Sequence, residues 1–390
     1  MDKYQIHKFS NKLLQKSVFS HLDHYTKNMA AGKPLQGNKF APISINVDLT
    51  TGCNFNCAHC IDEHIINTGK LLKIDYIKGL IKNWSKNGLK SVILIGGGEP
   101  TLYPYFEDVV KFIKKLDLQL GIVSNGARID RIEKIVKLLE RKDWVRFSID
   151  AGKNESFQRL HSPLVRITLE DVLVGAKSLR GKNNQLQIGY SFLVIGDDKY
   201  IKKIKLLNNI KEISLAAKLA KENGFSYISV KPYIDPEGAR ATKVSSKNLK
   251  EIAEEIKKSR KYETDSFKVI DSINLRVFYD KELEKSMKNQ SEICHIQFFR
   301  LIVTPDGIFQ CSLWRGFDNA KIIDANKKLD QKYYKNLNEK RLEILKKFNA
   351  KNICSEVKCL YSPFNSWAEK MIKGSEESAK PVEDFNDYFL

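Results

Sequence analysis

The sequence predicts an α/β fold, namely a partial (β/α)6 TIM-like barrel followed by a small α+β domain. From residue 43 onward, short apolar runs alternate with helical patterns of about 10–15 residues, which is typical of βαβ units and a parallel sheet. Beyond residue 235 the pattern changes to a polar segment, a helix and a Pro-Asp-Gly hairpin. This change predicts a domain boundary near residue 235.

Four parts of the 390-residue chain follow from these patterns. They are a helical leader at 1–42, a barrel at 43–235, a C-terminal domain at 236–374 and an acidic tail at 375–390. A hydrophobic content of 42% is enough for the barrel to bury a sizeable core.

The leader and the barrel are predicted from hydrophobic periodicity. Leu14, Val18 and Leu22 recur at i, i+4 spacing, which predicts an amphipathic helix over residues 10–30. Strand-like runs lie at 43–49, 91–97, 119–125, 144–150, 186–195 and 226–233. Helical patterns lie between them at 74–87, 105–116, 129–141, 168–179 and 210–223. In βα barrels the functional residues gather at the carboxyl ends of the strands, so we expect them there.

The sequence of the C-terminal part predicts a mixture of helices and a hairpin. Pro305-Asp306-Gly307 between two apolar runs predicts a tight turn, because proline presets φ and glycine tolerates positive φ. The other expected features are a linker at 235–248, helices at 247–258, 327–348 and 364–373, and a strand-like run at 267–279.

The chain carries a net charge of +19, which attracts nucleic acid or other anions when it is concentrated on one surface. No stripe of basic and aromatic residues is apparent, so we interpret the charge as lysines on solvated helix faces and expect no nucleic-acid partner. No run of about 18 apolar residues occurs, which predicts no membrane-spanning helix and no membrane partner. The polar N-terminus has no secretory signal, which favours a cytoplasmic location.

Three cysteines form the motif on which the functional prediction depends. Cys53, Cys57 and Cys60 have Cys-x3-Cys-x2-Cys spacing. Three close thiols suit a metal centre with one open coordination site, because a closed site needs a fourth ligand. Zinc with His59 as a fourth ligand is an alternative, although His59 directly precedes Cys60. A second alternative, reduced cysteines without a metal, fits poorly with the polar residues between them.

This motif after a short strand resembles the signature of the radical S-adenosylmethionine (SAM) enzymes. The resemblance implies that Cys53, Cys57 and Cys60 hold a [4Fe–4S] cluster whose fourth iron binds SAM. In that family, electron transfer cleaves SAM to methionine and a 5′-deoxyadenosyl radical, which abstracts hydrogen from the substrate. The resemblance also implies an electron donor such as flavodoxin or ferredoxin.

Further SAM contacts follow from the same resemblance. GGGEP after the second strand is similar to the family's Gly-Gly-Glu motif, which implies that Gly97, Gly98 and Glu99 contact the methionine amino group. The remaining implied SAM contacts are Ser124, Asn125, Ser148, Asp150 and Ser191, with Ser148 and Asp150 at the ribose. The sequence does not identify a catalytic acid or base, for which His161, Lys231 and Tyr233 are candidates.

Four later cysteines, Cys294, Cys311, Cys354 and Cys359, form a second group. The hairpin brings Cys294 and Cys311 near each other in the predicted fold. The group resembles the auxiliary-cluster region of radical SAM enzymes of the SPASM/twitch type, which implies one further [4Fe–4S] cluster in a twitch-like domain. Structural zinc on the same four thiolates is the alternative, and His295 is a possible replacement for a thiolate.

The most direct functional hypothesis is an oxidoreductase-like radical SAM enzyme that oxidises a small molecule, with the auxiliary cluster as electron acceptor. A peptide-modifying enzyme is the second hypothesis. Only about 44 residues precede the first strand, too few for the family's peptide-binding module, and this favours the small molecule. A zinc-stabilised RNA-binding protein is the hypothesis from another functional class.

Overall fold

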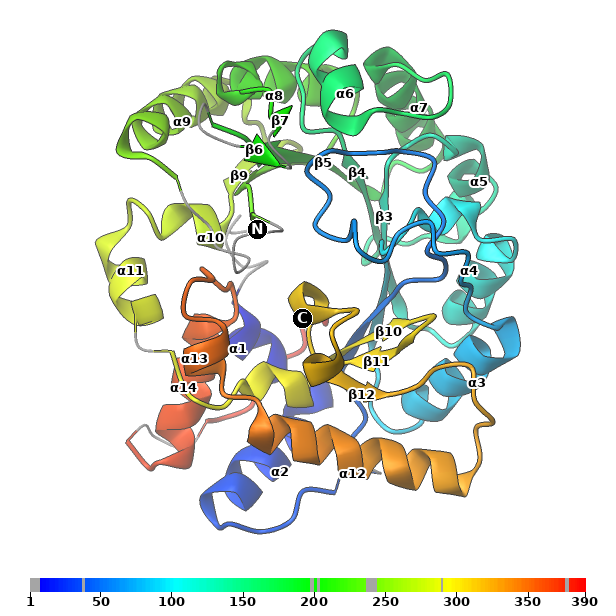
Figure 1. Cartoon of the computed structure of the whole chain (residues 1–390), viewed down its shortest axis with the longest axis vertical. Coiled ribbons are helices and arrows are strands. Elements are labelled where there is room, and N and C mark those ends of the chain that lie inside the picture. The colour runs from blue at the N-terminus through cyan, green and yellow to red at the C-terminus, as the bar shows by residue number, and fades with distance from the viewer. Residues whose placement is uncertain are drawn as a thin grey trace.

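The computed structural model describes residues 8–36, 39–196, 200–201, 204–235, 244–288, 290–375 and 379–390. Its main feature is a curved ten-stranded sheet with helices along its outer face (Figure 1). The strand order is β12-β11-β10-β1-β2-β3-β4-β5-β8-β9. The edges β12 and β9 do not pair with each other, so the sheet is an open, partial barrel.

The six strands expected of the barrel are confirmed. They are β1 (Ser44–Val47), β2 (Ser91–Leu94), β3 (Gln119–Ser124), β4 (Trp144–Ser148), β5 (Gln187–Val194) and β8 (Tyr227–Pro232). Each pairs with its neighbour in parallel, so all carboxyl ends lie at one edge of the sheet. A small ribbon of β6 (Tyr200–Ile201) and β7 (Ile204–Lys205) lies outside this sheet.

Helices connect the barrel strands and cover their outer face. They are α3 (Ile74–Ser85), α4 (Phe106–Lys115), α5 (Ile129–Glu133), α6 (Asn154–His161), α7 (Leu169–Lys182) and α8 (Ile213–Glu222). The predicted helix at 129–141 is shorter than expected, because the chain continues after α5 as a 3-10 turn at Val136–Leu138. Among the helices of the described residues, none combines the length and apolar composition needed to cross a membrane.

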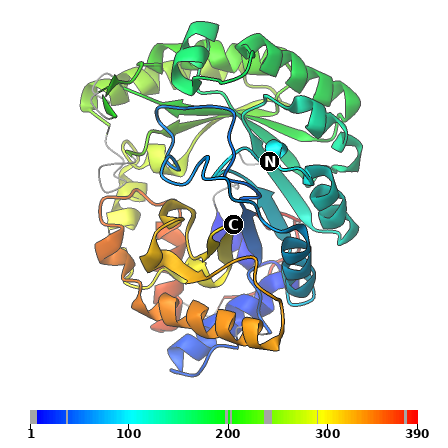
Figure 2. The same ribbon diagram turned by 45° about the vertical axis from the view of Figure 1, so that its right-hand side comes forward.

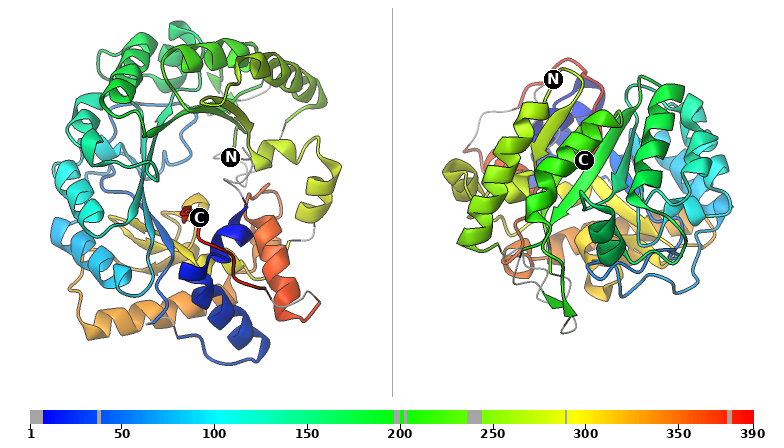
Figure 3. Two further views of the ribbon diagram at one scale, coloured as in Figure 1. Left: turned by 180° about the vertical axis from the view of Figure 1, so that it is seen from behind. Right: turned by 90° about the horizontal axis from the view of Figure 1, so that it is seen from above.

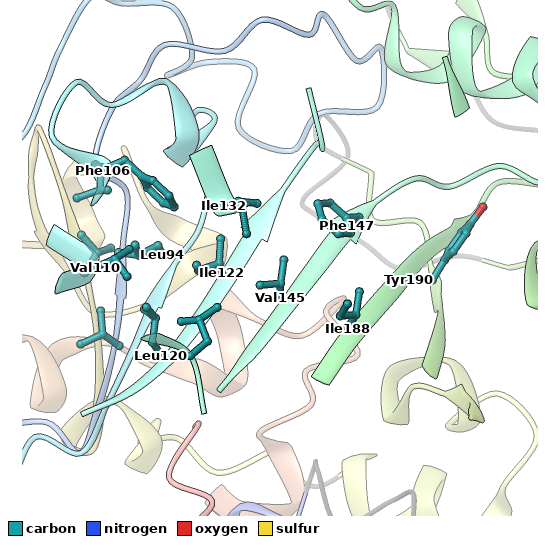
Figure 4. Close-up of a cluster of buried hydrophobic side chains, with 14 of the residues drawn as sticks. Leu94, Phe106, Val110, Leu120, Ile122, Ile132, Val145, Phe147, Ile188 and Tyr190 are labelled. Atoms are coloured by element: carbon teal, nitrogen blue, oxygen red, sulfur yellow. The ribbon is translucent and has the colours of Figure 1, made fainter. Parts of the chain in front are cut away.

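The core lies between the sheet and these helices. Alternate strand residues such as Val145, Phe147, Ile188 and Tyr190 are fully buried there (Figure 4). Because side chains alternate across a strand, the residues between them lie on the opposite, inner face of the sheet.

The C-terminal half continues the same sheet. β9 (Lys268–Asp271) pairs in parallel with β8, and β10 (Arg300–Thr304) pairs in parallel with β1. The expected hairpin is confirmed, since β11 (Gly307–Phe309) runs antiparallel to β10, and β12 (Lys321–Ile323) follows. Much of the predicted linker, residues 236–243, lies outside the described residues. The division into two domains therefore stays a prediction.

Helices complete this half of the chain. They are α9 (Ser246–Ser259), α10 (Ile273–Arg276), α11 (Lys281–Lys288), α12 (Gln331–Lys347), α13 (Ala350–Ile353) and α14 (Ser362–Ile372). The strand-like run predicted at 267–279 is wrong in its second half. After β9 the carbonyl of Ser272 accepts hydrogen bonds from the N–H groups of Leu275 and Arg276, which starts α10 and buries Leu275.

The leader forms α1 (Phe9–Leu13) and α2 (Lys16–Ala30) instead of one helix. The break is at Gln15, which pairs with Val382 of the C-terminal tail. Residues 379–390 of the tail run beside α1 and α2 (Figure 3). The side chain of Gln119, at the start of β3, bonds Asn386 O and Tyr388 N, so the tail lies at the amino end of the barrel strands. Residues 376–378 of the tail are outside the described part.

Gln15 is the main attachment point of the tail, and replacing it should destabilise the protein. Its fully buried Oε1 accepts from Phe385 N at 2.9 Å and Asn386 N at 2.8 Å, while Nε2 donates to Asp387 O at 2.9 Å. In Gln15→Leu these backbone groups lose their partners, so we expect a loss of about 3 kcal/mol in unfolding free energy, measured by urea denaturation.

The exposed Gln185→Leu is the matched control, with an expected change within about 0.5 kcal/mol. Equal stability of the two variants would contradict a structural role for the tail contact.

Candidate active site

The loop between β1 and α3 carries Cys53, Cys57 and Cys60 and lies at the carboxyl edge of the sheet (Figure 2). The side chain of Asn67 closes the loop by accepting a hydrogen bond from Cys53 N at 2.7 Å. All three cysteines are free and only partly exposed. The structure therefore brings the predicted thiols together on one loop.

Burial and mutual repulsion oppose ionisation of these thiols. Burial raises the pKa of Cys57 well above its usual value, and the charges of Cys60 and Cys53 raise it further. Burial also raises the pKa of Cys60 to about 12. Three thiolates within electrostatic reach of one another need a positive centre to remain charged, which is the chemistry of a metal or iron–sulfur site.

Two histidines lie directly against this loop. His161 Nδ1 lies 3.2 Å from Cys57 Sγ, and His161 Nε2 lies 2.8 Å from Ile149 O. His59 Nε2 lies 3.1 Å from Asp150 Oδ2. Ligand atoms of His59, Asp150 and His161 all lie within 4.8 Å of one another and are buried. Their contacts with Cys57 and Ile149 O lead us to interpret the trio as a hydrogen-bond network that supports the cysteine loop.

Asp150 was expected to bind the SAM ribose, and its carboxylate has partners within the chain. Oδ1 accepts from Leu193 N at 2.7 Å, and Oδ2 faces His59. Its backbone has a left-handed φ of +54°. This conformation turns the chain at the end of β4. The ribose contact remains a prediction.

The glycine segment after β2 packs against the start of the cysteine loop. Glu99 N donates to Gly52 O at 2.8 Å. A Cβ on Gly98 would lie 2.7 Å from Gly52 O and closer still to Thr50 O, so only glycine allows this approach. A Cβ on Gly97 would lie 2.9 Å from Asp48 Oδ2. The predicted motif and the cysteine loop therefore meet at one place.

Glu99 is almost completely buried and is held by its own chain. Oε1 accepts from Thr101 and from Ser124 Oγ at 2.9 Å, and Oε2 accepts from Asn125 N at 2.7 Å. Burial raises its pKa, although these donors counteract the effect. Glu99 thus fixes the ends of β2 and β3 relative to each other. Its predicted contact with the SAM ammonium group is not tested by these bonds.

The expected serines form a row across the sheet. Ser148 of β4 is in register with Ser191 of β5, which is in register with Ser229 of β8. Their strand neighbours face the helices, so all three lie on the inner face. Asn125, the remaining expected contact, donates through Nδ2 to Asn54 Oδ1 of the cysteine loop at 2.8 Å.

The four later cysteines also converge. Burial raises the pKa of Cys294 well above its usual value, and the charges of Cys359, Cys311 and Cys354 raise it further. Three segments, around Cys294, around Cys311 and at 354–359, therefore bring four thiols within electrostatic reach of one another, near the aromatic side chain of Trp314.

His295 does not have a free nitrogen for a metal. Its Nδ1 lies 2.7 Å from Tyr25 Oη and its Nε2 lies 2.7 Å from Glu369 Oε2. The idea that His295 replaces a thiolate is therefore wrong for this arrangement. Both ring nitrogens are used to attach the segment before β10 to α2 and α14.

Arg315 connects the two cysteine groups, and sequence reasoning missed it. It follows Cys311 by four residues, is 5% exposed, and donates through Nη1 to both carboxylate oxygens of Asp48 at 2.8 Å. Its Nε lies 3.3 Å from Asp62 Oδ1, two residues beyond Cys60, and it also bonds Gly96 O. The available signals were weak: a lone arginine after a cysteine and an aspartate at a strand end.

The charges of Arg315, Asp48 and Asp62 influence one another. Burial raises the pKa of Asp48 to about 7, against the lowering effect of Arg315. Burial lowers the pKa of Arg315, but Asp48 and Asp62 outweigh it and keep the guanidinium charged. Arg315 is thus the counter-charge for two carboxylates that belong to the barrel and the cysteine loop.

Comparisons with known proteins agree with this geometry. Residues 47–205 match the model of the Radical SAM superfamily. A 113-residue segment is 32% identical to an S-adenosylmethionine-dependent nucleotide dehydratase of Thermoplasmatales archaeon (strain ISO4-H5), covering 28% of this chain and 38% of that protein. Alignments with the first curated relatives span 38% to 62% of their lengths.

The fold is similar to solved structures over most of the chain. Streptococcus suis SuiB bound to precursor peptide SuiA aligns with a TM-score of 0.57 at 16% identity, covering 89% of this chain and 76% of SuiB. The structure of native anSMEcpe with bound AdoMet and Kp18Cys peptide aligns with a TM-score of 0.56 at 15% identity, covering 85% of this chain and 96% of that chain. At these identities the likeness concerns the fold.

Removing Arg315 should strongly destabilise the contact between the Cys311 segment and the barrel, which its ion pairs with Asp48 and Asp62 hold together. Arg315→Met leaves Asp48 and Asp62 buried without their counter-charge, so we expect a loss of about 3–5 kcal/mol in unfolding free energy, measured by urea denaturation. Asp48→Asn in the same chain removes one of the unpaired charges and should restore part of the loss. A double variant no more stable than Arg315→Met would contradict the ion pair as the cause.

Proposed function

Since this chain belongs to the radical SAM superfamily, we propose that it is an enzyme that cleaves SAM reductively and abstracts hydrogen from a small-molecule substrate. The observation that carries the proposal is the meeting of the three-thiol loop and the glycine segment at the carboxyl edge of the sheet. When bound, a [4Fe–4S] cluster and SAM supply the one-electron chemistry that starts this reaction.

The donor set suits such a cluster. Cys53, Cys57 and Cys60 offer three thiolates and leave one coordination position open. Gly97 and Gly98 lack side chains and therefore pack directly against Asp48 and the backbone of the cysteine loop, which brings the glycine segment beside the three thiols. Glu99, Ser124 and Asn125 hold this backbone in place through their mutual hydrogen bonds.

We also propose that Cys294, Cys311, Cys354 and Cys359 hold an auxiliary [4Fe–4S] cluster. A tetrahedral zinc site needs sulfurs about 3.8 Å apart, because each Zn–S bond is about 2.3 Å. Among the described residues, the trio found with all ligand atoms within 4.8 Å is His59, Asp150 and His161, and it contains no cysteine. No three thiols of the described residues therefore lie all within 4.8 Å of one another, and this supports the larger cluster over zinc.

An auxiliary centre fits an oxidation of the substrate. After hydrogen abstraction, a substrate must lose one more electron to become an oxidised product, and a second cluster is a suitable acceptor. Arg315 attaches the Cys311 segment to the loop of Cys60 through Asp62, so the two proposed centres are held in a fixed relation. Family membership favours this enzyme over the RNA-binding alternative.

Peptide modification is a second candidate function, favoured by one observation. The chain shares its fold with SuiB, which was solved with the precursor peptide SuiA. An assay of substrate classes separates the two candidates, because a peptide enzyme leaves deuterium from a labelled peptide in 5′-deoxyadenosine and a small-molecule enzyme does not.

Iron and sulfide counting tests the two proposed clusters. After anaerobic reconstitution we expect about eight irons in the wild type and about four in the Cys53/Cys57/Cys60 triple alanine variant. SAM cleavage to 5′-deoxyadenosine should occur in the wild type alone. About four irons in the wild type and almost none in the variant would remove the auxiliary cluster from the proposal.

Gly98→Ala tests the glycine segment. The new Cβ meets the carbonyls of Thr50 and Gly52, so the loop must move, and we expect SAM affinity to fall at least tenfold, or about 1.4 kcal/mol. Equilibrium dialysis with labelled SAM measures it. Gly181→Ala in α7, where a Cβ meets nothing within 4 Å, is the matched control. Unchanged SAM binding in Gly98→Ala would count against this segment as a SAM contact.

A further inference from the structure

Cationic side chains lie on the inner face of the barrel sheet, the face that the predicted SAM contacts also share. Arg146 lies between Val145 and Phe147, which point into the core beneath the helices. Lys231 follows Val230, another core residue, in the same way. By the alternation of strands, both Arg146 and Lys231 are therefore on the inner face.

Register places these two cations around the serine row. Arg146 is in register with Gly189 and lies one inner-face position before Ser148. Lys231 lies one inner-face position after Ser229. The row of Ser148, Ser191 and Ser229 thus runs across the sheet between a guanidinium and an ammonium group.

Arg146 has no charge partner in the described part of the chain. Its guanidinium stacks over the Trp144 ring at 5.4 Å, and its Nε is buried without a hydrogen bond. Its side chain is nevertheless partly exposed, so a ligand can reach it. A buried, unpaired donor on a cation costs folding free energy unless something binds there.

Lys231 likewise has no charge partner in the described part of the chain. Among the described residues Lys231 has neither a hydrogen bond nor an ion pair, and it is partly exposed. Burial lowers its pKa well below the usual value, and the charge of Arg146 lowers it further. The two cations are therefore close enough to repel each other, and a shared anion would relieve that repulsion.

The carboxylate of Asp150, which lies near Lys231, already has hydrogen-bond partners within the chain. Asp150 attracts Lys231, but its oxygens accept from Leu193 N and face His59. Within the part of the chain that the structure describes, the inner face therefore has an excess of positive charge that no carboxylate neutralises.

We propose that Arg146 and Lys231, with the hydroxyl of Ser229 between them, bind an anionic group of the substrate, a phosphate or a carboxylate. Hydroxyls and cations together are the usual donors for such groups. This inference rests on the proposed function for the identity of the ligand as substrate, and it narrows the substrate to an acidic small molecule.

Binding of simple anions tests the site. Anaerobically reconstituted protein is titrated by calorimetry with inorganic phosphate and, separately, with succinate. We expect saturable binding of one or both with Kd below about 10 mM, weakened at least tenfold in Arg146→Gln and in Lys231→Met. The tighter of the two probes identifies the group as a phosphate or a carboxylate.

Two exposed residues give matched controls. Arg141→Gln and Lys221→Met remove the same charges from exposed positions and so lower the net charge equally. Both should bind the probes as the wild type does. Arg146→Lys keeps the charge and should bind more tightly than Arg146→Gln.

Thermal unfolding separates binding from folding. Removing an unpaired cation relieves repulsion, so Arg146→Gln and Lys231→Met should have a Tm equal to or above that of the wild type without a probe. The probe should raise the Tm of the wild type and not that of the variants. A large fall in Tm for both variants would show structural residues and overturn the proposal.

Three further results of these experiments would overturn the proposed anion site, reassign its cations or separate it from the proposed function. Absence of saturable binding to the wild type, or equal binding to the wild type and both variants, overturns the proposal. SAM affinity is measured in the same samples, and a tenfold loss there with unchanged probe binding would assign the cations to SAM itself. Failure of SAM cleavage with intact anion binding would remove the proposed function and leave the anion site standing.

Discussion

The parallel pairing of β10 with β1 determines where the two cysteine groups lie relative to each other. Ser44 to Val47 are in register with Arg300 to Val303. β1 leads directly into the loop of Cys53, and the β10–β11 hairpin leads into Cys311. A slip of two residues in this register would move the second segment by about 6.6 Å. The ion pair of Arg315 with Asp48 joins the same two segments a second time.

Buried carboxylates organise the carboxyl edge of the sheet. Asp48, Glu99 and Asp150 each follow a barrel strand, and each accepts hydrogen bonds from its own chain. Because a buried carboxylate without donors is costly, these bonds hold the loops above the strands in defined positions. The side chains that resemble ligand contacts in sequence thus hold the loops in place, while the thiols of Cys53, Cys57 and Cys60 stay free. This arrangement is consistent with a preorganised binding site.

The sequence predicted the barrel strands and both cysteine groups because these features have local signatures. Alternation of apolar runs and helical patterns identifies a βα unit without reference to the rest of the chain, and closely spaced cysteines are visible directly. The place of β10 was not predictable in this way, since its pairing with β1 joins residues about 250 positions apart and leaves no local pattern. Arg315 was missed for the same reason: its role exists only once that pairing has brought it to Asp48.

The inner face of the sheet differs from its carboxyl edge in the state of its charged groups, and this difference bears on the substrate. The carboxylates Asp48, Glu99 and Asp150 all have donors. Arg146, in contrast, has a buried nitrogen without an acceptor, and Lys231 has no ion pair among the described residues. Buried acceptors without a donor also occur among the described residues, such as Asn46 Oδ1, so what favours an anion is that Arg146 and Lys231 are both cations. The net charge of +19 acts in the same direction, because it raises the concentration of anions near the protein. An acidic substrate would therefore be attracted by the whole chain and would meet its counter-charges on the inner face, beside the row of serines.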